Sequence, residues 1–576
     1  MGASLNVSSK ALISGVILLA AEPALAQQAG PLPDAIRPPA VAKELAPQPL
    51  VNGGGGGYGA APLFSPFPRD GALQPLSFRV PGLKPADEAP REFDVTFGVE
   101  GDEKWSDNVY STPQPTKADF ITSAGASLGA NVDTRRVKGG LNYGLTYDKY
   151  ATYSDLDGFR QNGIGLFDAE VIDQRFFISG RASVSQQSIS ATGPTTADSR
   201  TAAGNTVRVY TESVSPRVQQ RFGEWALGQI SYHHDETRYE NASQGTPQTN
   251  SVTTSQSMTA ANLNDSRTDG GRVEVRGGEA FSRLLWDYTG DVNRDVSSAR
   301  TFDQVTHTVG TEYRLSADFG LLAAVGNDYL HSTAIDLSTY GGAFYSGGVH
   351  WTPSPDTDLR VGLGRRYDRP DWIMLLAHWL GPTTVVRVSV SSGVTTDSLS
   401  FERALNAVQR DVDGGFVDPF SGLTANPSAS PFSRSNSIYW QRNSDLVLRH
   451  DELRDSVALS ARVAEQQVIG TANNLNSQFG TNTTPGSSAT VLAAYLTWMH
   501  HFTPDVSGLA VISQSDTIVS GGAIGRVTQR KGSLSLNYTL NPTLMGTLGY
   551  NIISTAPTPS GNISENMIAA GLRKTF

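Results

Sequence analysis

Cysteine is absent from the 576-residue sequence, methionine is scarce at six residues, and only 17% of the residues are charged. Without cysteine, neither a disulfide framework nor a cysteine-based metal site can form. Apart from the very start of the chain, no apolar run approaches the ~20 residues that a membrane-spanning helix needs. The net charge of −10 is not accompanied by a cluster of lysine and arginine that could bind phosphates, so nucleic acid is not an expected partner.

The first 26 residues have the pattern of a secretory signal peptide. Lys10 precedes the apolar run ALISGVILLA, and the small residues ALA at 24–26 stand where a cleavage site is expected. A membrane anchor is the alternative, but the apolar run is short and its continuation is polar and rich in proline. We therefore expect an exported protein whose mature chain starts at Gln27.

Residues 27–90 are rich in proline and glycine and include the run NGGGGG. Such a composition buries too little apolar surface to offset the entropy lost on ordering, so we expect a disordered tether. A phosphate-binding loop is the alternative reading of the glycine run. It is disfavoured because no Gly-Lys-Ser/Thr sequence follows.

From about residue 91 to the end, apolar and polar residues alternate along short segments. In KGSLSLNYTL, leucine and tyrosine occupy every second position, and serine, asparagine and threonine lie between them. Because successive side chains of a strand point to opposite faces, this pattern predicts strands with one apolar and one polar face. The closing sequence NMIAAGLRKTF has the same pattern and ends on Phe576.

The connections between these segments are of two kinds. Short turn sequences occur at 133–136, 221–224, 354–357, 381–384, 449–452, 503–506 and 541–543. Longer polar stretches occur at 241–264, 398–435 and 469–488. Tight turns at one end and long loops at the other are typical of outer-membrane barrels.

Residues 91–576 are therefore expected to form one transmembrane antiparallel β-barrel of all-β class. The segments sum to about 22 strands, within a range of about 16–22, and an even number leaves both termini at the same end. A solenoid or propeller would show a sequence repeat, which is not found. A sandwich is a further alternative, but closure removes the strand edges and pairs every backbone group, as a bilayer requires.

Charged residues on the polar faces are the candidates for the channel interior. An arginine on the lipid side costs ~2–4 kcal/mol at the bilayer midplane, so these side chains should point into water. The candidates are Asp148, Asp287, Asp291, Arg360, Arg366, Arg387 and Arg462. Mixed charges suit a hydrated polar solute without strong ion selectivity. The alternative is that these residues only pair with one another and fill the interior.

We expect no enzyme activity, no catalytic residue, no metal site and no cofactor. In YHHDE at 232–236, His233 and Asp235 share one face of a strand while His234 and Glu236 share the other, so the four cannot converge on one metal.

One helix is expected within the longest loop region. SFERALNAVQRD places apolar residues at helical spacing after Ser400, which is the expected N-cap. The pattern leaves open whether this helix folds into the barrel as a constriction or packs on the outer rim.

The C-terminal strand resembles the assembly signal of Gram-negative outer-membrane proteins, which ends on an aromatic residue such as Phe576. The sequence departs from that signal at Lys574, where an apolar residue is usual. Lys574 is expected to extend towards the periplasmic headgroups. The resemblance implies barrel assembly machinery and outer-membrane lipid as partners.

The first strands have a narrower resemblance. FDVTFGVEGDEKWSDNVY and the following KADFITSAGASLGANVDTRRVKGGLNYGLTYDKYATY are similar to the opening of a β-barrel porin family found in exopolysaccharide and exosortase (PEP-CTERM) loci. The matching motif residues are Ser106, Asp107, Asn108, Asp119, Phe120 and Ile121. The motif covers about residues 93–152. The resemblance implies an outer-membrane barrel linked to secretion or display of an extracellular polysaccharide.

Three functions remain open on the sequence. The first is an outer-membrane channel for export or surface display of a polysaccharide, with the polymer and periplasmic export components as partners. The second is a general porin for small solutes. The third is a non-conducting structural or adhesive barrel.

Overall fold

The computed structural model describes residues 92–576 except 114, 192, 194, 198–204, 241–262, 411–414, 423, 426–429, 433, 471–487, 521–524 and 559–560. The expected signal peptide (1–26) and tether (27–90) lie outside the described residues. So do most of the expected loops 241–264 and 469–488.

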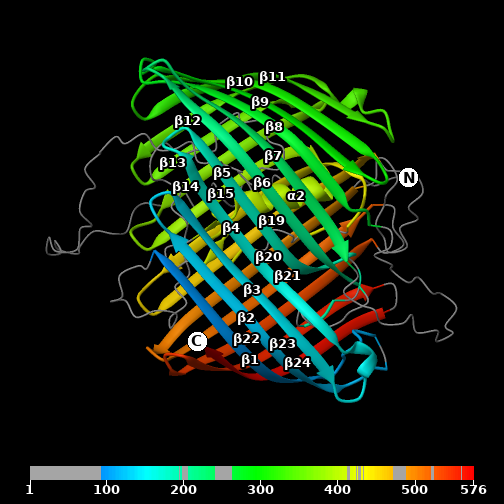
Figure 1. The fold of residues 1–576 in the computed structure, drawn as a ribbon. Helices are drawn as coiled ribbons and strands as arrows, with labels where there is room; N and C mark the ends of the chain where they lie inside the picture. The colour runs from blue at the N-terminus through cyan, green and yellow to red at the C-terminus, as the bar shows by residue number, and fades with distance from the viewer. Residues whose placement is uncertain are drawn as a thin grey trace, which may run out of the picture. The chain divides into compact units, whose positions relative to one another are not determined.

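Twenty-two long strands form one sheet (Figure 1). They are β1 (Phe93–Ser106), β2 (Asp119–Asp133), β3 (Val137–Tyr150), β4 (Gly158–Ile172), β5 (Phe176–Ser188), β6 (Thr206–Phe222), β7 (Ala226–Glu240), β8 (Ser266–Gly277), β9 (Leu284–Ser297), β10 (Thr301–Arg314), β11 (Phe319–Ser332), β12 (Gly342–Ser354), β13 (Thr357–Arg366), β14 (Arg369–Trp379), β15 (Thr384–Thr395), β18 (Ile438–Asp451), β19 (Asp455–Gly470), β20 (Ser488–Thr503), β21 (Val506–Val519), β22 (Arg526–Asn541), β23 (Leu544–Thr558) and β24 (Gly561–Thr575).

The sheet closes into a barrel because β1 pairs with both its sequence neighbour β2 and the last strand β24. The β1–β24 register runs from Gly98↔Thr575 to Ser106↔Met567, and every pairing around the ring is antiparallel. The expected closed barrel is thereby confirmed at 22 strands. We call the end where β1 starts and β24 finishes the turn end, and the opposite end the loop end.

The connections follow the expected division. The β2–β3, β12–β13 and β22–β23 connections at the turn end are only a few residues long, whereas residues 396–437 join β15 to β18 at the loop end. Some expected turns shift by a few residues. β6 ends at Phe222 and β7 starts at Ala226, so this connection is 223–225 rather than 221–224. β18 continues to Asp451, so the connection to β19 is 452–454 rather than 449–452.

Smaller elements lie within the connections that leave the strands at the loop end. They are η2 (Ser154–Leu156), η4 (Ser338–Tyr340), α2 (Asp397–Ala407), β16 (Gln409–Arg410) and β17 (Phe416–Val417). The expected N-cap at Ser400 is wrong. Thr396 caps α2, since its hydroxyl accepts a 3.3 Å hydrogen bond from the Leu399 N–H, and Ser400 lies inside the helix. Among the residues that the structure describes, no helix has the length and hydropathy to cross a membrane; this finding does not bear on spanning by strands.

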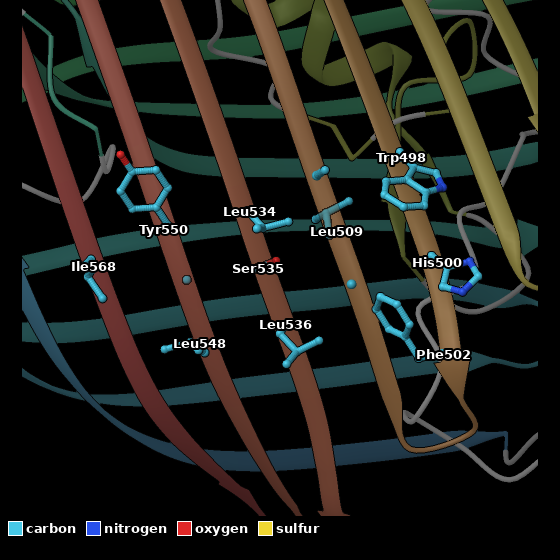
Figure 2. A pocket seen from close by; sticks show the side chains of 13 residues that line it. Trp498, His500, Phe502, Leu509, Leu534, Ser535, Leu536, Leu548, Tyr550 and Ile568 are labelled. Atoms are coloured by element: carbon cyan, nitrogen blue, oxygen red, sulfur yellow. The ribbon is translucent and has the colours of Figure 1, made fainter.

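The outer face of the strands is apolar. In β22, every second residue from Leu534 to Leu540 is exposed outwards, and in β24 Ile568 and Leu572 do the same. Figure 2 shows this face over β20–β24, where Trp498, Phe502, Leu536, Leu548 and Tyr550 line a shallow hollow. Exposed apolar side chains of this number are tolerated only where lipid covers them.

Aromatic side chains gather at both ends of the apolar band. At the turn end the exposed aromatics include Phe97, Phe222, Trp225, Tyr313, Trp351, Phe502 and Phe576. At the loop end they are Phe120, Tyr147, Phe159, Tyr329 and Tyr345. Two aromatic girdles of this kind mark the two membrane interfaces of a transmembrane barrel.

Candidate channel interior

The seven charged candidates lie on the inward-facing positions of their strands. On β9, for example, Asp287 and Asp291 alternate with the outward residues Leu284, Val292 and Val296. An added Cβ at Gly310 of β10 would lie 2.7 Å from Asp287 Oδ1, so this carboxylate covers the neighbouring glycine. Asp291 forms a 3.4 Å ion pair with Arg272 of β8.

Three further candidates are paired across strands. Asp148 is fully buried; it accepts a 2.7 Å hydrogen bond from Ser123 Oγ and lies 3.5 Å from Arg160 Nε. Arg366 donates to both carboxylate oxygens of Asp328 at 2.6 and 2.7 Å. Arg462 donates to Asp445 at 2.5 Å. The wall therefore neutralises much of its own charge.

Arg360 belongs to a chain of charges near the turn end of β10, β12 and β13. Its Nε lies 3.2 Å from Asp358 Oδ1, and the same carboxylate oxygen lies 3.3 Å from His350 Nε2. His350 Nδ1 lies 3.1 Å from Glu312. Within the described ranges, no group of three or more His, Asp or Glu side chains could hold a metal ion.

Arg387 contacts the segment 396–437 rather than another strand. It is fully buried on the inner face of β15, and its Nη1 donates to the carbonyls of Pro419 at 2.7 Å and Phe420 at 3.2 Å. Arg387 lies near the turn end of β15, whereas the segment leaves β15 at the loop end. The segment therefore descends into the barrel.

The helix α2 forms the upper part of this inward segment. It packs against β5, β6 and β7, and Figure 1 shows it within the ring of strands. Phe401 is buried against Val207 and Val209 of β6. Glu402 accepts a 3.1 Å hydrogen bond from Thr268 of β8. Of the two placements left open by the sequence, the helix takes the inward one.

The lower part of the segment reaches the turn end of β2 and β3. Arg410 on β16 donates to the carbonyls of Gly139 at 2.5 Å and Val132 at 3.3 Å, and to Asn131 Oδ1 at 3.1 Å. Val408 and Phe416 pack against Leu166 of β4. The segment thus spans the interior and constricts it.

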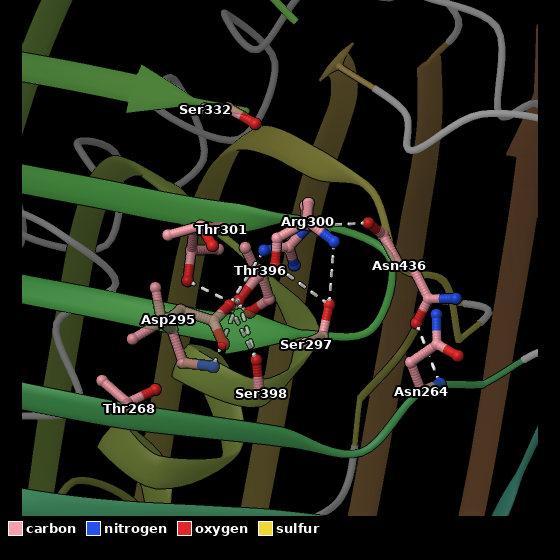
Figure 3. A network of polar contacts seen from close by, with 12 residues as sticks. Asn264, Thr268, Asp295, Ser297, Arg300, Thr301, Ser332, Thr396, Ser398 and Asn436 are labelled. Carbon is pink, nitrogen blue, oxygen red and sulfur yellow. Dashed lines mark hydrogen bonds and ion pairs between the residues drawn. The ribbon is translucent and has the colours of Figure 1, made fainter. Parts of the chain in front are cut away.

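A buried polar network holds the two ends of the inward segment 396–437 in place (Figure 3). Asp295 of β9 forms a 3.0 Å ion pair with Arg300 and accepts hydrogen bonds from Thr396 at 2.9 Å and Ser398 at 3.1 Å. Arg300 Nε donates to the carbonyl of Asn436 at 2.9 Å. The start of α2 and Asn436, two residues before β18, are thereby tied to the end of β9 and to the β9–β10 connection.

Glu402 is a buried ionisable group of the inward segment. Burial raises its pKa well above the usual value because the charged form loses its hydration, and the carboxylates of Asp235 and Asp295 raise it further. The neighbouring Arg403 opposes this shift. Glu402 therefore favours its protonated form while α2 is seated.

A second loop, 189–205, crosses the loop end of the barrel. Ala197 N donates to Glu565 Oε2 of β24 at 2.8 Å, and Gln529 Nε2 of β22 donates to Thr195 Oγ1 at 2.8 Å. Thr195 Oγ1 also lies 3.3 Å from Thr555 Oγ1 of β23. A connection that leaves β5 therefore covers the loop end of β22–β24.

The family-motif residues Ser106, Asp107 and Asn108 fasten the seam between β1 and β24. The Asp107 carboxylate accepts two hydrogen bonds from Asn566. The Asn566 backbone N–H donates at 2.8 Å, and Asn566 Nδ2 donates at 2.7 Å. Ser106 Oγ donates to Glu565 at 2.7 Å, and Asn108 Nδ2 donates to the Ser564 carbonyl at 2.9 Å.

The second half of the motif organises the neighbouring loop. Asp119 accepts from the backbone N–H groups of Thr152 and Tyr153 at 3.0 Å. Phe120 is exposed on the outer face, while Ile121 is fully buried in a cluster with Val109 and Tyr150.

The last residue closes the seam at the turn end. Phe576 N donates to the Phe97 carbonyl at 2.8 Å, and the two rings lie 6.2 Å apart. Lys574 Nζ donates to Thr543 Oγ1 in the β22–β23 connection at 2.6 Å, so the lysine extends beyond the apolar band.

Sequence reasoning missed the residues that anchor the inward segment, namely Asp295, Arg300, Glu402 and Arg410. The only available signal was their charge within otherwise apolar or hydroxyl-rich stretches. The sequence reasoning also assumed that no G-x-S-x-G motif is present, which is wrong, because residues 125–129 match it. It lies in the middle of β2, where Ser127 Oγ accepts from Arg573 at 3.0 Å, and not at the strand-to-helix turn that exposes a catalytic serine.

Together these features define a transmembrane β-barrel of the outer-membrane type, with a polar interior that is narrowed by an inward-folded loop. No family model matches the chain. No curated protein matches it either.

Among solved structures, the chain is similar to the FrpB iron transporter from Neisseria meningitidis in its apoprotein form, with 11% identity, a TM-score of 0.44, and coverage of 83% of this chain and 81% of that chain. It is also similar to the siderophore receptor PirA from Pseudomonas aeruginosa, with 10% identity, a TM-score of 0.35, and coverage of 85% and 81%. Similarity at this level transfers no ligand.

Proposed function

We propose that this protein is an outer-membrane channel for hydrated polar solutes, and that it serves the export or surface display of an extracellular polysaccharide. The observation that carries the channel proposal is the closed ring itself, apolar outside and polar inside, with one loop folded into its interior. The role in polysaccharide export is the more specific part of the proposal. It is supported by the family resemblance of the motif at Ser106–Asn108 and Asp119–Ile121.

A transport role is proposed in preference to catalysis. Many of the described inward carboxylates are engaged with arginine, histidine or hydroxyl groups, as in Asp148, Asp328 and Asp295. Such pairing neutralises a wall rather than activating a nucleophile.

The non-conducting surface barrel is the second candidate, and the inward segment 396–437 together with loop 189–205 favours it. A general porin would use the same wall as the export channel. Loss of capsule or matrix on deletion of the gene, with nutrient uptake intact, would favour export over a general porin.

The test is conductance in planar bilayers of the full chain and of a variant lacking 400–430. The deletion should leave the ring intact, because Thr395 and Tyr439 already pair directly across β15 and β18. We expect single-channel conductance to rise, since the constriction is removed. Conductance that does not change on deletion would contradict the constriction, and absence of conductance from both proteins would contradict the channel.

A further inference from the structure

The inner wall of the barrel is not uniform around the ring. On β5–β11, inward polar residues are mostly buried; Thr211, Ser213, Asp235, Thr268 and Asp295 are each at most 2% exposed. On β21–β23, inward residues remain partly exposed to the interior. We call six of these the neutral wall: Ser507, Ser533, Ser535, Asn537, Thr547 and Asn551.

Strand register groups the six residues on β22 and its two neighbours, with the apolar inward residues Leu509 and Val511 of β21 beside Ser535 and Ser533. Asn537 of β22 pairs with Ser507 of β21 on one side and with Thr547 of β23 on the other. Ser533 pairs with Asn551 on β23. Because inward residues recur every second position, about 6.6 Å apart along a strand, the polar groups form a regular track rising from the turn end.

The side chains of the neutral wall keep their hydrogen-bonding capacity. In the described part of the chain, none of the six makes a side-chain hydrogen bond to protein, and all six are partly exposed to the interior, whereas the residues of the opposite wall are buried. Hydroxyl and amide groups both donate and accept, and they carry no charge. Such a surface matches a ligand that also presents donors and acceptors without charge.

The two loops leave this track accessible from one end. The described hydrogen bonds of the inward segment run to other strands, as those of Arg410 and Glu402 do. Loop 189–205 binds Gln529, Thr555 and Glu565, which lie at the loop end of the strands carrying the wall or of the adjacent β24. The track therefore starts at the turn end and stops beneath this loop.

We propose that the neutral wall is a binding track for an uncharged, polyhydroxylated chain such as a neutral oligosaccharide, which enters from the turn end. The proposal rests on the channel function and adds the substrate class and its location. Two charged groups border the track. Lys531 is inward-facing on β22 and exposed, and it would favour an acidic chain. Asp102 of β1 lies beside Thr547, since a Cβ added at Gly571 would lie 1.9 Å from Asp102 Oδ1 and 3.1 Å from Thr547 Oγ1, and it would disfavour an acidic chain.

The test is isothermal titration calorimetry of the full chain in detergent micelles with maltohexaose as the neutral probe and hexagalacturonate as the acidic probe. We expect maltohexaose to bind and the variant N537A/N551A to bind about 25-fold more weakly, because each lost neutral hydrogen bond costs about fivefold. N537L serves as a second variant that keeps the side-chain volume. The matched control is T289A, on the buried wall of β9, which should bind as the wild type does.

Several results would overturn this assignment. They are no binding of maltohexaose, equal binding by N537A/N551A, or tighter binding of hexagalacturonate that is lost in K531Q. Failure here is distinguishable from failure of the channel proposal: a barrel that conducts ions but binds no maltohexaose retains the channel and loses the track.

Discussion

At the scale of single residues, the interior is governed by the cost of burying charge. Arg300 and Asp295 are almost completely buried together, and their mutual attraction, with added hydrogen bonds from Thr396 and Ser398, offsets their desolvation. Such a pair contributes little net stability, but removing one partner leaves an uncompensated charge. The network therefore fixes where the inward segment is attached.

Glu402 makes the seating of α2 dependent on pH. Its pKa is raised in the folded state by burial and by Asp235 and Asp295. Its contribution to stability is thus fully present below the unfolded pKa, about 4.3, and is lost as the pH rises through the folded pKa. The segment should be held more tightly in mild acid than at alkaline pH.

We predict that E402Q flattens this pH dependence and tightens the segment at neutral pH, because glutamine accepts the same bond from Thr268 without ionising. The measurement is the rate of chymotrypsin cleavage within 396–437 between pH 5 and pH 9, where wild type should become faster with pH. Asp397 is a second buried acid whose pKa is raised mainly by burial. It is present in both proteins, so its contribution to the pH dependence does not affect the comparison. Equal slopes for both proteins would refute a role for Glu402.

At the scale of elements, α2 shows what alternation and helical spacing leave undetermined. The apolar spacing indicates a helix but not the side of the barrel wall on which the helix packs. A helix against the outer rim and a helix against inner-wall residues such as Val207 both need one apolar stripe along the helix. The cap was misplaced because TTDSLS offers several capping residues in succession. The partner that decides between them, Asp295, lies 101 residues away.

We predict that T396A destabilises α2 by about 1 kcal/mol, with roughly fivefold faster hydrogen exchange of the amides at the start of the helix. T396S should behave as wild type because it retains the hydroxyl. S400A is the matched control, since Ser400 lies within the helix and its loss should change exchange little. A larger effect of S400A than of T396A would restore Ser400 as the cap.

At the scale of the whole molecule, strand number and closure were predictable from the sequence. A strand of 14–17 residues with one apolar face is recognisable from its alternation alone, as in β6 and β22. The resulting even count leaves both termini at one end. The course of the long loop was not predictable. Arg410 and Gly139 are 271 positions apart, and no local pattern encodes their contact.

The seam is where the ring depends on distant parts of the sequence. We predict that D107A lowers the free energy of unfolding in urea by about 2 kcal/mol, because hydrogen bonds to a charged acceptor contribute more than neutral ones. The measurement is the urea concentration at which the protein in micelles loses its heat-modifiable band, which marks the folded barrel. D173A is the control, because Asp173 is exposed and only 3.6 Å from the equally exposed Arg135, so it should shift unfolding by less than about 0.5 kcal/mol.

The direct pairing of Thr395 with Tyr439 has a consequence for how such a pore can be altered. The barrel is already closed without the forty-odd residues between those two partners. This connection can therefore be shortened, lengthened or exchanged while the surrounding strands keep their register. Pore width and barrel stability are thus separable in this fold, and the width of the pore can be changed by altering a single connection.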